Sequence, residues 1–113
     1  MAQITAYKIK GGTPVKGEIQ CLGAKNFATK AMVCALLGNS PTTLTNVPQI
    51  GDVDITKKLL ETVGAKAIWV DDTTLNIDPT TVNTHKVTTP DSRNNRLPIL
   101  LIPFLLHKYG QAT

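Results

Sequence analysis

Residues 23–41 read GAKNFATKAMVCALLGNSP, and this run sets a strand-to-helix junction from which the rest of the chain can be interpreted. Gly23 permits a sharp backbone turn after a preceding strand. Gly38 and Pro41 mark the helix end, because glycine commonly follows a last helical turn and proline cannot continue it. The apolar spacing between them predicts a helix with one core-facing side, formed by Phe27, Ala31, Val33, Cys34, Leu36 and Leu37.

Working outward from this helix, the sequence predicts a sheet with helices packed on it. On the N-terminal side, Tyr7–Lys10 is expected to be extended and Val15–Leu22 to be a strand. On the C-terminal side, a short β-branched strand over 42–46 leads to a second helix with the buried positions Ile55, Leu59, Leu60 and Val63. Residues 66–70 and 74–77 then read as a hairpin.

A second unit of the same kind begins after this hairpin. A strand is expected around 82–87, and a helix over Leu97–Tyr109 that Pro103 should kink or split. Residues 111–113 look like the entry to another strand. We therefore predict an α/β fold with one complete repeat and part of a second, in residues 1–113 as a single partial domain of a longer repeat protein.

Composition narrows the function classes. The chain has 113 residues, a formal net charge of +4, 42% hydrophobic and 18% charged residues, which describes one globular domain. Its longest apolar run, Leu97–Leu106, is half the length of a membrane span. Two cysteines favour a reducing, cytoplasmic location. The dispersed basic residues and few aromatics argue against nucleic acid and favour a small anionic partner.

The run Gly23-Ala24-Lys25-Asn26 is the first candidate binding site. A helix start offers unpaired N–H groups with partial positive charge, Lys25 adds a full charge, and Asn26 supplies a donor and an acceptor. These features together suit a phosphate or carboxylate beside a sugar hydroxyl. The structural alternative is that Gly23 turns the chain, Asn26 caps the helix and Lys25 is solvated.

A second cationic pair, Arg93 and Arg96, lies three residues apart at the expected start of the last helix. Guanidinium groups suit bidentate contacts with phosphate or carboxylate, although a solvated helix start is the simpler interpretation. Asp52 and Asp54 could bind a metal but are more simply caps of the second helix.

The cysteines and histidines are the remaining side chains with reactive chemistry. Cys34 falls on the apolar side of the first helix and is expected in the core. Cys21 is either a half-buried strand residue or a reactive thiol near Lys25. His85 and His107 have no partner at useful spacing, so neither is assigned a role.

Four segments carry a resemblance to enolpyruvyl transferases of the UDP-N-acetylglucosamine 1-carboxyvinyltransferase type. They are Gly11–Ile19, Gly23–Asn26, Leu44–Val53 and Leu59–Ala65. The resemblance implies an inside-out α/β barrel of β-α-β-α-β-β repeats, in which residues 1–22 supply strands to the other domain's sheet. It implies transfer of the enolpyruvyl group of phosphoenolpyruvate to the 3-hydroxyl of UDP-N-acetylglucosamine, with no metal or organic cofactor.

By position, the resemblance assigns substrate roles to four residues of this chain. Lys25 matches a lysine that contacts phosphoenolpyruvate, and Asn26 matches an asparagine that holds the sugar nucleotide. Arg96 matches an arginine lining the substrate site, and Arg93 a commonly basic position. The family's proton donor, a cysteine or an aspartate in a glycine-rich loop, would follow Thr113, so this chain alone is expected to be inactive.

Two departures and two alternatives accompany this resemblance. The family usually reads Met-Arg-Ala-Ser-Ile where this chain has Asn95-Arg96-Leu97-Pro98-Ile99, and Pro103 lies one residue earlier than the family proline.

A 3-phosphoshikimate 1-carboxyvinyltransferase is the second candidate for the function, although its family typically has Gly-Ser-Lys-Ser at residues 23–26. The other is a non-catalytic module that binds an anion or a partner, with self-association through open sheet edges.

Overall fold

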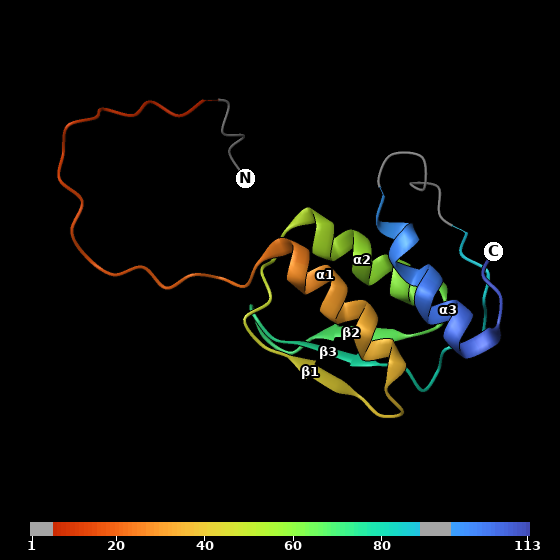
Figure 1. Cartoon of the computed structure of the whole chain (residues 1–113). Coiled ribbons are helices and arrows are strands. Elements are labelled where there is room, and N and C mark those ends of the chain that lie inside the picture. The colour runs from red at the N-terminus through yellow and green to blue at the C-terminus, as the bar shows by residue number, and fades with distance from the viewer. Residues whose placement is uncertain (1–5, 89–95) are drawn as a thin grey trace.

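The computed structural model describes residues 6–88 and 96–113, and it places three helices on one side of a small sheet (Figure 1). The helices are α1 (Lys25–Cys34), α2 (Gly51–Thr62) and α3 (Leu101–Tyr109). The 3₁₀ turn η1 (Ala35–Leu37) extends α1, and η3 (Leu97–Leu100) precedes α3. The predicted mixture of helices and sheet is confirmed.

The sheet consists of β1 (Thr42–Leu44), β2 (Lys66–Trp69) and β3 (Leu75–Asp78). Its order is β1-β3-β2, and both neighbours run antiparallel to the central strand. Ala67, Leu75 and Ile77 are buried against the helices, whereas Ile68 is 62% exposed on the opposite face. The predicted hairpin is therefore confirmed, and its alternation of buried and exposed residues defines the covered face.

The first helix forms as predicted, and Val33 and Leu36 of its expected core-facing side are buried, but the other expected residues are not. Its buried residues are Ala28, Thr29, Met32 and Val33, followed by Ala35 and Leu36 of η1. Phe27 is 72% exposed, and Cys34 is also exposed, so the expectation that Cys34 lies in the core is wrong. Helix α1 packs against α2, and this packing selects the buried side.

The second helix begins at Gly51 after Ile50, and neither Asp52 nor Asp54 makes a capping hydrogen bond. The predicted aspartate cap is therefore wrong, although both residues lie in the first turn, where the helix dipole favours negative charge. The helix ends at Thr62, and the left-handed residue Gly64, whose φ is 94°, turns the chain away just beyond it. The N–H of Gly64 donates to the carbonyl oxygen of Glu61, and the N–H of Ala65 donates to the carbonyl oxygen of Leu60. This pair of hydrogen bonds is a Schellman motif.

The last helix is split, as the prolines predict. The 3₁₀ turn η3 holds Pro98 at its start, and α3 then begins two residues before Pro103. Pro103 thus sits in the first helical turn, where a missing N–H costs least. The expected strand over 82–87 is not formed as a regular element, but Val87 N–H donates to the oxygen of Thr113, and Thr113 N–H donates to that of His85. Two segments predicted to be strands therefore begin to pair.

The predicted strand at 15–22 is absent. Residues 6–22 form neither helix nor strand, and they run as a long exposed arm away from the helices and the sheet (Figure 1). The reason is that a strand needs a neighbour to satisfy its N–H and C=O groups, and this arm lies beside no strand of the described sheet. Its apolar side chains are accordingly exposed, with Val15 at 97% and Ile19 at 86%.

Candidate anion-binding site

Gly23 fixes where the first helix begins relative to the rest of the fold. Its N–H donates to the backbone oxygen of Asn46 over 3.0 Å, and the Asn46 side chain donates to the oxygen of Cys21. A Cβ at position 23 would overlap the Asn46 oxygen, so only glycine fits without a shift of the backbone. The sequence predicted a turn here, and the structure adds that the close approach to residue 46 requires glycine.

Two helix N-termini meet through an ion pair. Lys25 is the first residue of α1, and its Nζ lies 3.0 Å from Oδ2 of Asp52 in the first turn of α2. The side chains are 56% and 40% exposed, so water screens the attraction and the pair contributes little to stability. Its main consequence is geometric, because it directs the Lys25 ammonium toward the start of α2.

Asp52 in turn lines a cavity of 290 Å³ between α1, α2 and η3. Its polar lining comes from Asn26, Thr29 and Lys30 of α1, Asp52 of α2, and Arg96 just before η3. Three apolar residues complete the wall: Leu97, Ile99 and Leu100. The cavity thus combines amide, hydroxyl, ammonium and guanidinium groups on an apolar base, a lining that can orient an anionic ligand.

The structure brings together two of the predicted site residues and places a third beside them. Asn26 and Arg96, far apart in the sequence, line the same cavity. Lys25 does not line it but is paired with Asp52, which does. Asn26 lies within α1 and Ala24 occupies the cap position without a side-chain bond, so the interpretation of Asn26 as a cap is wrong. Arg93 lies outside the described residues.

Two cavity residues, Thr29 and Lys30, were missed by sequence reasoning, and Asp52 was considered only as a metal ligand or a helix cap. The spacing of Asn26, Thr29 and Lys30 follows the i, i+3, i+4 rule for one helix face, which could have revealed the first two. Asp52 carried no such local signal, because its proximity to Lys25 arises only from the packing of α1 against α2.

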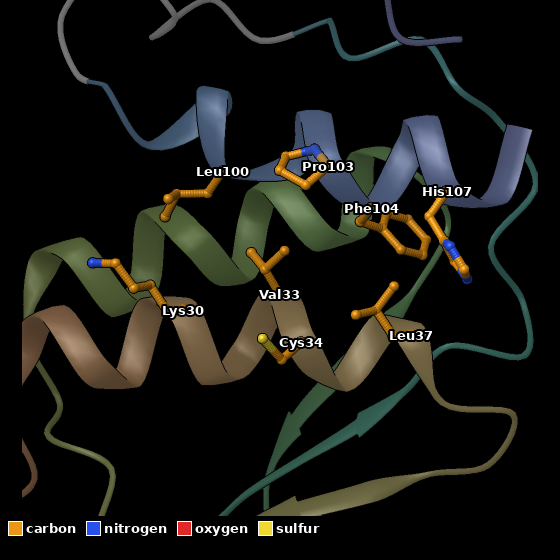
Figure 2. A pocket seen from close by; sticks show the side chains of 8 residues that line it. All are labelled: Lys30, Val33, Cys34, Leu37, Leu100, Pro103, Phe104 and His107. Carbon is orange, nitrogen blue, oxygen red and sulfur yellow. The ribbon is translucent and has the colours of Figure 1, made fainter. Parts of the chain in front are cut away.

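A second, apolar cavity of 430 Å³ lies between α1 and α3 (Figure 2). Val33, Leu37 and Phe104 line it, and Cys34 faces into it from α1. His107 and Lys30 lie toward opposite ends of this cavity.

Both cysteines are free and exposed, so Cys21 is an accessible thiol and not a half-buried strand residue. Among the described residues, no three His, Cys, Asp or Glu side chains are grouped to hold a metal ion.

Two carboxyl groups with shifted titration lie at turns and not at the cavity. The pKa of Asp71 is lowered chiefly because the backbone N–H of Thr73 donates to its carboxylate, with further bonds from Thr73 and Thr74. The pKa of Asp78 is lowered chiefly by the hydroxyl of Thr80. These bonds stabilise the β2–β3 turn and the end of β3, so we assign them a structural role.

The fold and cavity define an α/β unit in which two helix starts meet beside a cavity lined by cationic, polar and apolar side chains. The family model described as EPSP synthase (3-phosphoshikimate 1-carboxyvinyltransferase) matches residues 9–112. The chain belongs to this family.

Curated relatives support the same family. The chain is 38% identical over 106 residues to a UDP-N-acetylglucosamine 1-carboxyvinyltransferase of Idiomarina loihiensis, covering 94% of this chain and 25% of that protein. It is 42% identical over 93 residues to the protein of the same name from Chlamydia pneumoniae, covering 81% and 20%. The chain therefore spans about a quarter of the length of the curated relatives it matches.

The fold is also that of a solved relative. The enolpyruvyl transferase NikO from Streptomyces tendae superposes with a TM-score of 0.74 and 20% sequence identity, covering 90% of this chain and 24% of that one. This similarity establishes that the chain has part of an enolpyruvyl transferase fold. No described helix is long and apolar enough to cross a membrane.

Proposed function

We propose that this chain forms part of the substrate site of an enolpyruvyl transferase that acts on phosphoenolpyruvate and UDP-N-acetylglucosamine in peptidoglycan synthesis. The observation that carries this proposal is the shared cavity of Asn26 and Arg96, with Lys25 held at its edge by Asp52. The names of the curated relatives support the choice of substrates. The enolpyruvyl group would pass to the 3-hydroxyl of the sugar, with release of phosphate.

Each proposed role follows from side-chain chemistry. Lys25 would contact phosphoenolpyruvate, since an ammonium group at a helix start favours a small dianion. Asn26 would hold the sugar nucleotide near its reacting hydroxyl through its amide donor and acceptor. Arg96 would bind carboxylate or phosphate oxygens with two parallel N–H groups. Arg93 is proposed as an additional basic residue of the site.

The proton needed at the enolpyruvyl carbon would come from outside these 113 residues. In the family that the sequence resembles, the donor is a cysteine or an aspartate in a glycine-rich loop, and we propose that this loop follows Thr113. Cys21 lies in the N-terminal arm and Cys34 faces the apolar cavity, so neither is offered as the donor. The isolated chain should therefore bind substrate without releasing phosphate, and neither metal nor organic cofactor is proposed.

We further propose that the complete protein is an inside-out α/β barrel and that residues 1–22 contribute strands to its other domain. The described part of this arm, residues 6–22, pairs with no strand, and its exposed apolar side chains include Tyr7, Val15 and Ile19. Such a segment gains stability only by pairing elsewhere. Pairing with a second copy is the alternative. A cytoplasmic location is consistent with two free cysteines.

The test is a calorimetric and NMR titration of the chain with UDP-N-acetylglucosamine, phosphoenolpyruvate and 3-phosphoshikimate. We expect saturable binding of the first two, with amide shifts at Asn26 and near Arg96. Lys25→Ala should weaken phosphoenolpyruvate binding about tenfold or more, as expected for loss of a charge-assisted hydrogen bond. Lys58→Ala, which removes an exposed lysine from the same helix as Asp52, is the matched control.

Three outcomes would change the proposal. Preference for 3-phosphoshikimate over UDP-N-acetylglucosamine would favour the sister reaction, for which the matching family model is named. A stable oligomer that binds neither substrate would favour a non-catalytic interaction module. Phosphate release by the isolated chain, abolished in Lys25→Ala, would show that the proton donor lies within these residues.

A further inference from the structure

Lys30 is placed where the polar and the apolar cavity meet. It lines the first with Asn26 and Arg96, and it lines the second with Val33 and Cys34. Its Nζ lies 3.2 Å from the backbone oxygen of Asn26, one helical turn earlier. This hydrogen bond holds the ammonium group beside Asn26, whereas a freely solvated lysine side chain would sample many rotamers.

The charges around the polar cavity are unbalanced. Asp52 supplies its carboxylate, and Lys25 already lies 3.0 Å from that group. The other ion pair within the described ranges, Lys57 with Glu61, lies elsewhere on α2. Within residues 6–88 and 96–113, Lys30 and Arg96 therefore have no carboxylate at ion-pair distance. Two cations without a carboxylate partner in a concave site create a positive potential that favours an anion.

The hydrogen-bonding capacity of Lys30 is also unfilled. An ammonium group carries three donors, and the bond to the Asn26 oxygen uses one of them. The remaining two are available to a ligand oxygen. Because Asn26, Thr29 and Lys30 lie on one helix face, a ligand held by the Asn26 side chain would share that face with the Lys30 ammonium group.

We propose that Lys30 is a specificity-determining residue that, together with Arg96, binds a phosphate group of the anionic substrate. This inference rests on the proposed function and deepens it, because Lys30 has no part in the roles assigned above to Lys25, Asn26 and Arg96. The phosphate could belong to phosphoenolpyruvate or to the diphosphate of the sugar nucleotide. In both cases the chemistry is a phosphate oxygen accepting hydrogen bonds from an ammonium and a guanidinium group.

The experiment compares four forms of the chain: wild type, Lys30→Gln, Lys30→Arg and the control Lys58→Gln. Each is titrated with inorganic phosphate, phosphoenolpyruvate and UDP-N-acetylglucosamine at low and high salt. Lys30→Gln should weaken binding of the phosphate-bearing ligand about fivefold and reduce its salt dependence, as expected for loss of one solvent-screened charge contact. Lys30→Arg and Lys58→Gln should bind within about twofold of wild type. Lys30 is exposed, so unchanged melting of each variant is expected and shows that the fold is retained.

The ligands distinguish the source of the phosphate. A Lys30→Gln effect on phosphoenolpyruvate alone places the enolpyruvyl donor at Lys30, and an effect on UDP-N-acetylglucosamine alone places the diphosphate there. If Lys30→Gln binds every ligand within twofold of wild type, the inference is wrong even though the proposed function stands. If the wild type binds inorganic phosphate in a Lys30-dependent way but shows no preference for either substrate, the proposed function is wrong and the Lys30 site remains. If none of the titrations shows binding that depends on a phosphate group, the inference is wrong.

Discussion

Replacing Gly64 by alanine should destabilise the fold strongly, although it adds only one methyl group. Gly64 has φ of 94°, and a side chain in the left-handed region costs about 1–2 kcal/mol. The new Cβ would lie 2.7 Å from the backbone oxygen of Thr81 and 3.0 Å from Oδ1 of Asn83. Overpacking of this kind costs about 1–3 kcal/mol. Together these effects lower the free energy of unfolding by about 2–5 kcal/mol.

The neighbouring chain cannot easily move away from the added methyl group. The hydroxyl of Thr81 donates to the oxygen of Gly64 over 2.6 Å, and the N–H of Asn83 donates to that of Val63 over 3.1 Å. A shift that relieves the overlap therefore breaks one of these bonds or the helix end itself. The expected readout is a fall in melting temperature of about 10 °C or more, measured by circular dichroism and by urea unfolding.

A matched glycine provides the control for this prediction. Gly51 begins α2, and a Cβ there would meet no atom within 4 Å. Gly51→Ala should leave stability unchanged or raise it by up to about 1 kcal/mol, because alanine restricts the unfolded chain and favours helix. If Gly64→Ala melts within about 2 °C of wild type, the reasoning from the left-handed backbone and the close contact at Thr81 is refuted.

Three further predictions concern pH, thiol access and the site. Hydrogen bonds from Thr73 lower the pKa of Asp71 in the folded state. The Asp71 carboxylate therefore stabilises the fold at a pH above its unfolded pKa, and this stabilisation is lost as the pH falls through its folded pKa. The difference in urea stability between wild type and Asp71→Asn should therefore shrink from about pH 6 to about pH 3. Cys34 is exposed, so it should react with a thiol reagent in the native chain as fast as Cys21, and protection of Cys34 until unfolding would contradict the structure. Gly23→Ala should displace the start of α1 from Asn46 and weaken substrate binding. Its cost in stability should be only about 1 kcal/mol, the value of one hydrogen bond, because the preceding arm can shift freely; a loss as large as that expected for Gly64→Ala would show that the arm is packed.

The candidate site could be predicted only in part. Gly23, Lys25 and Asn26 lie within four residues, so the chemistry of a helix start identified them. Arg96 was a candidate from its guanidinium chemistry and its spacing to Arg93, and the resemblance to a family supplied its specific role. Lys30 carried no motif of its own, and the pattern around Asp52 indicated a cap or a metal ligand and not a neighbour of Lys25. Their roles depend on which residues face the cavity, and that is set by the packing of α1 against α2 and η3.

The order of elements followed from the sequence because its causes are local. Gly64 and Pro103 act on the backbone within a turn of their own positions, and apolar spacing depends only on near neighbours, so the helices and the hairpin could be placed. The buried side of α1 and the missing strand at 15–22 could not be placed in this way. Phe27 is exposed while Ala28 is buried because a helix presents apolar groups on more than one side, and only its packing partner selects among them. The arm remains unpaired because a strand is stabilised by a neighbouring strand, and no periodicity within a segment supplies one.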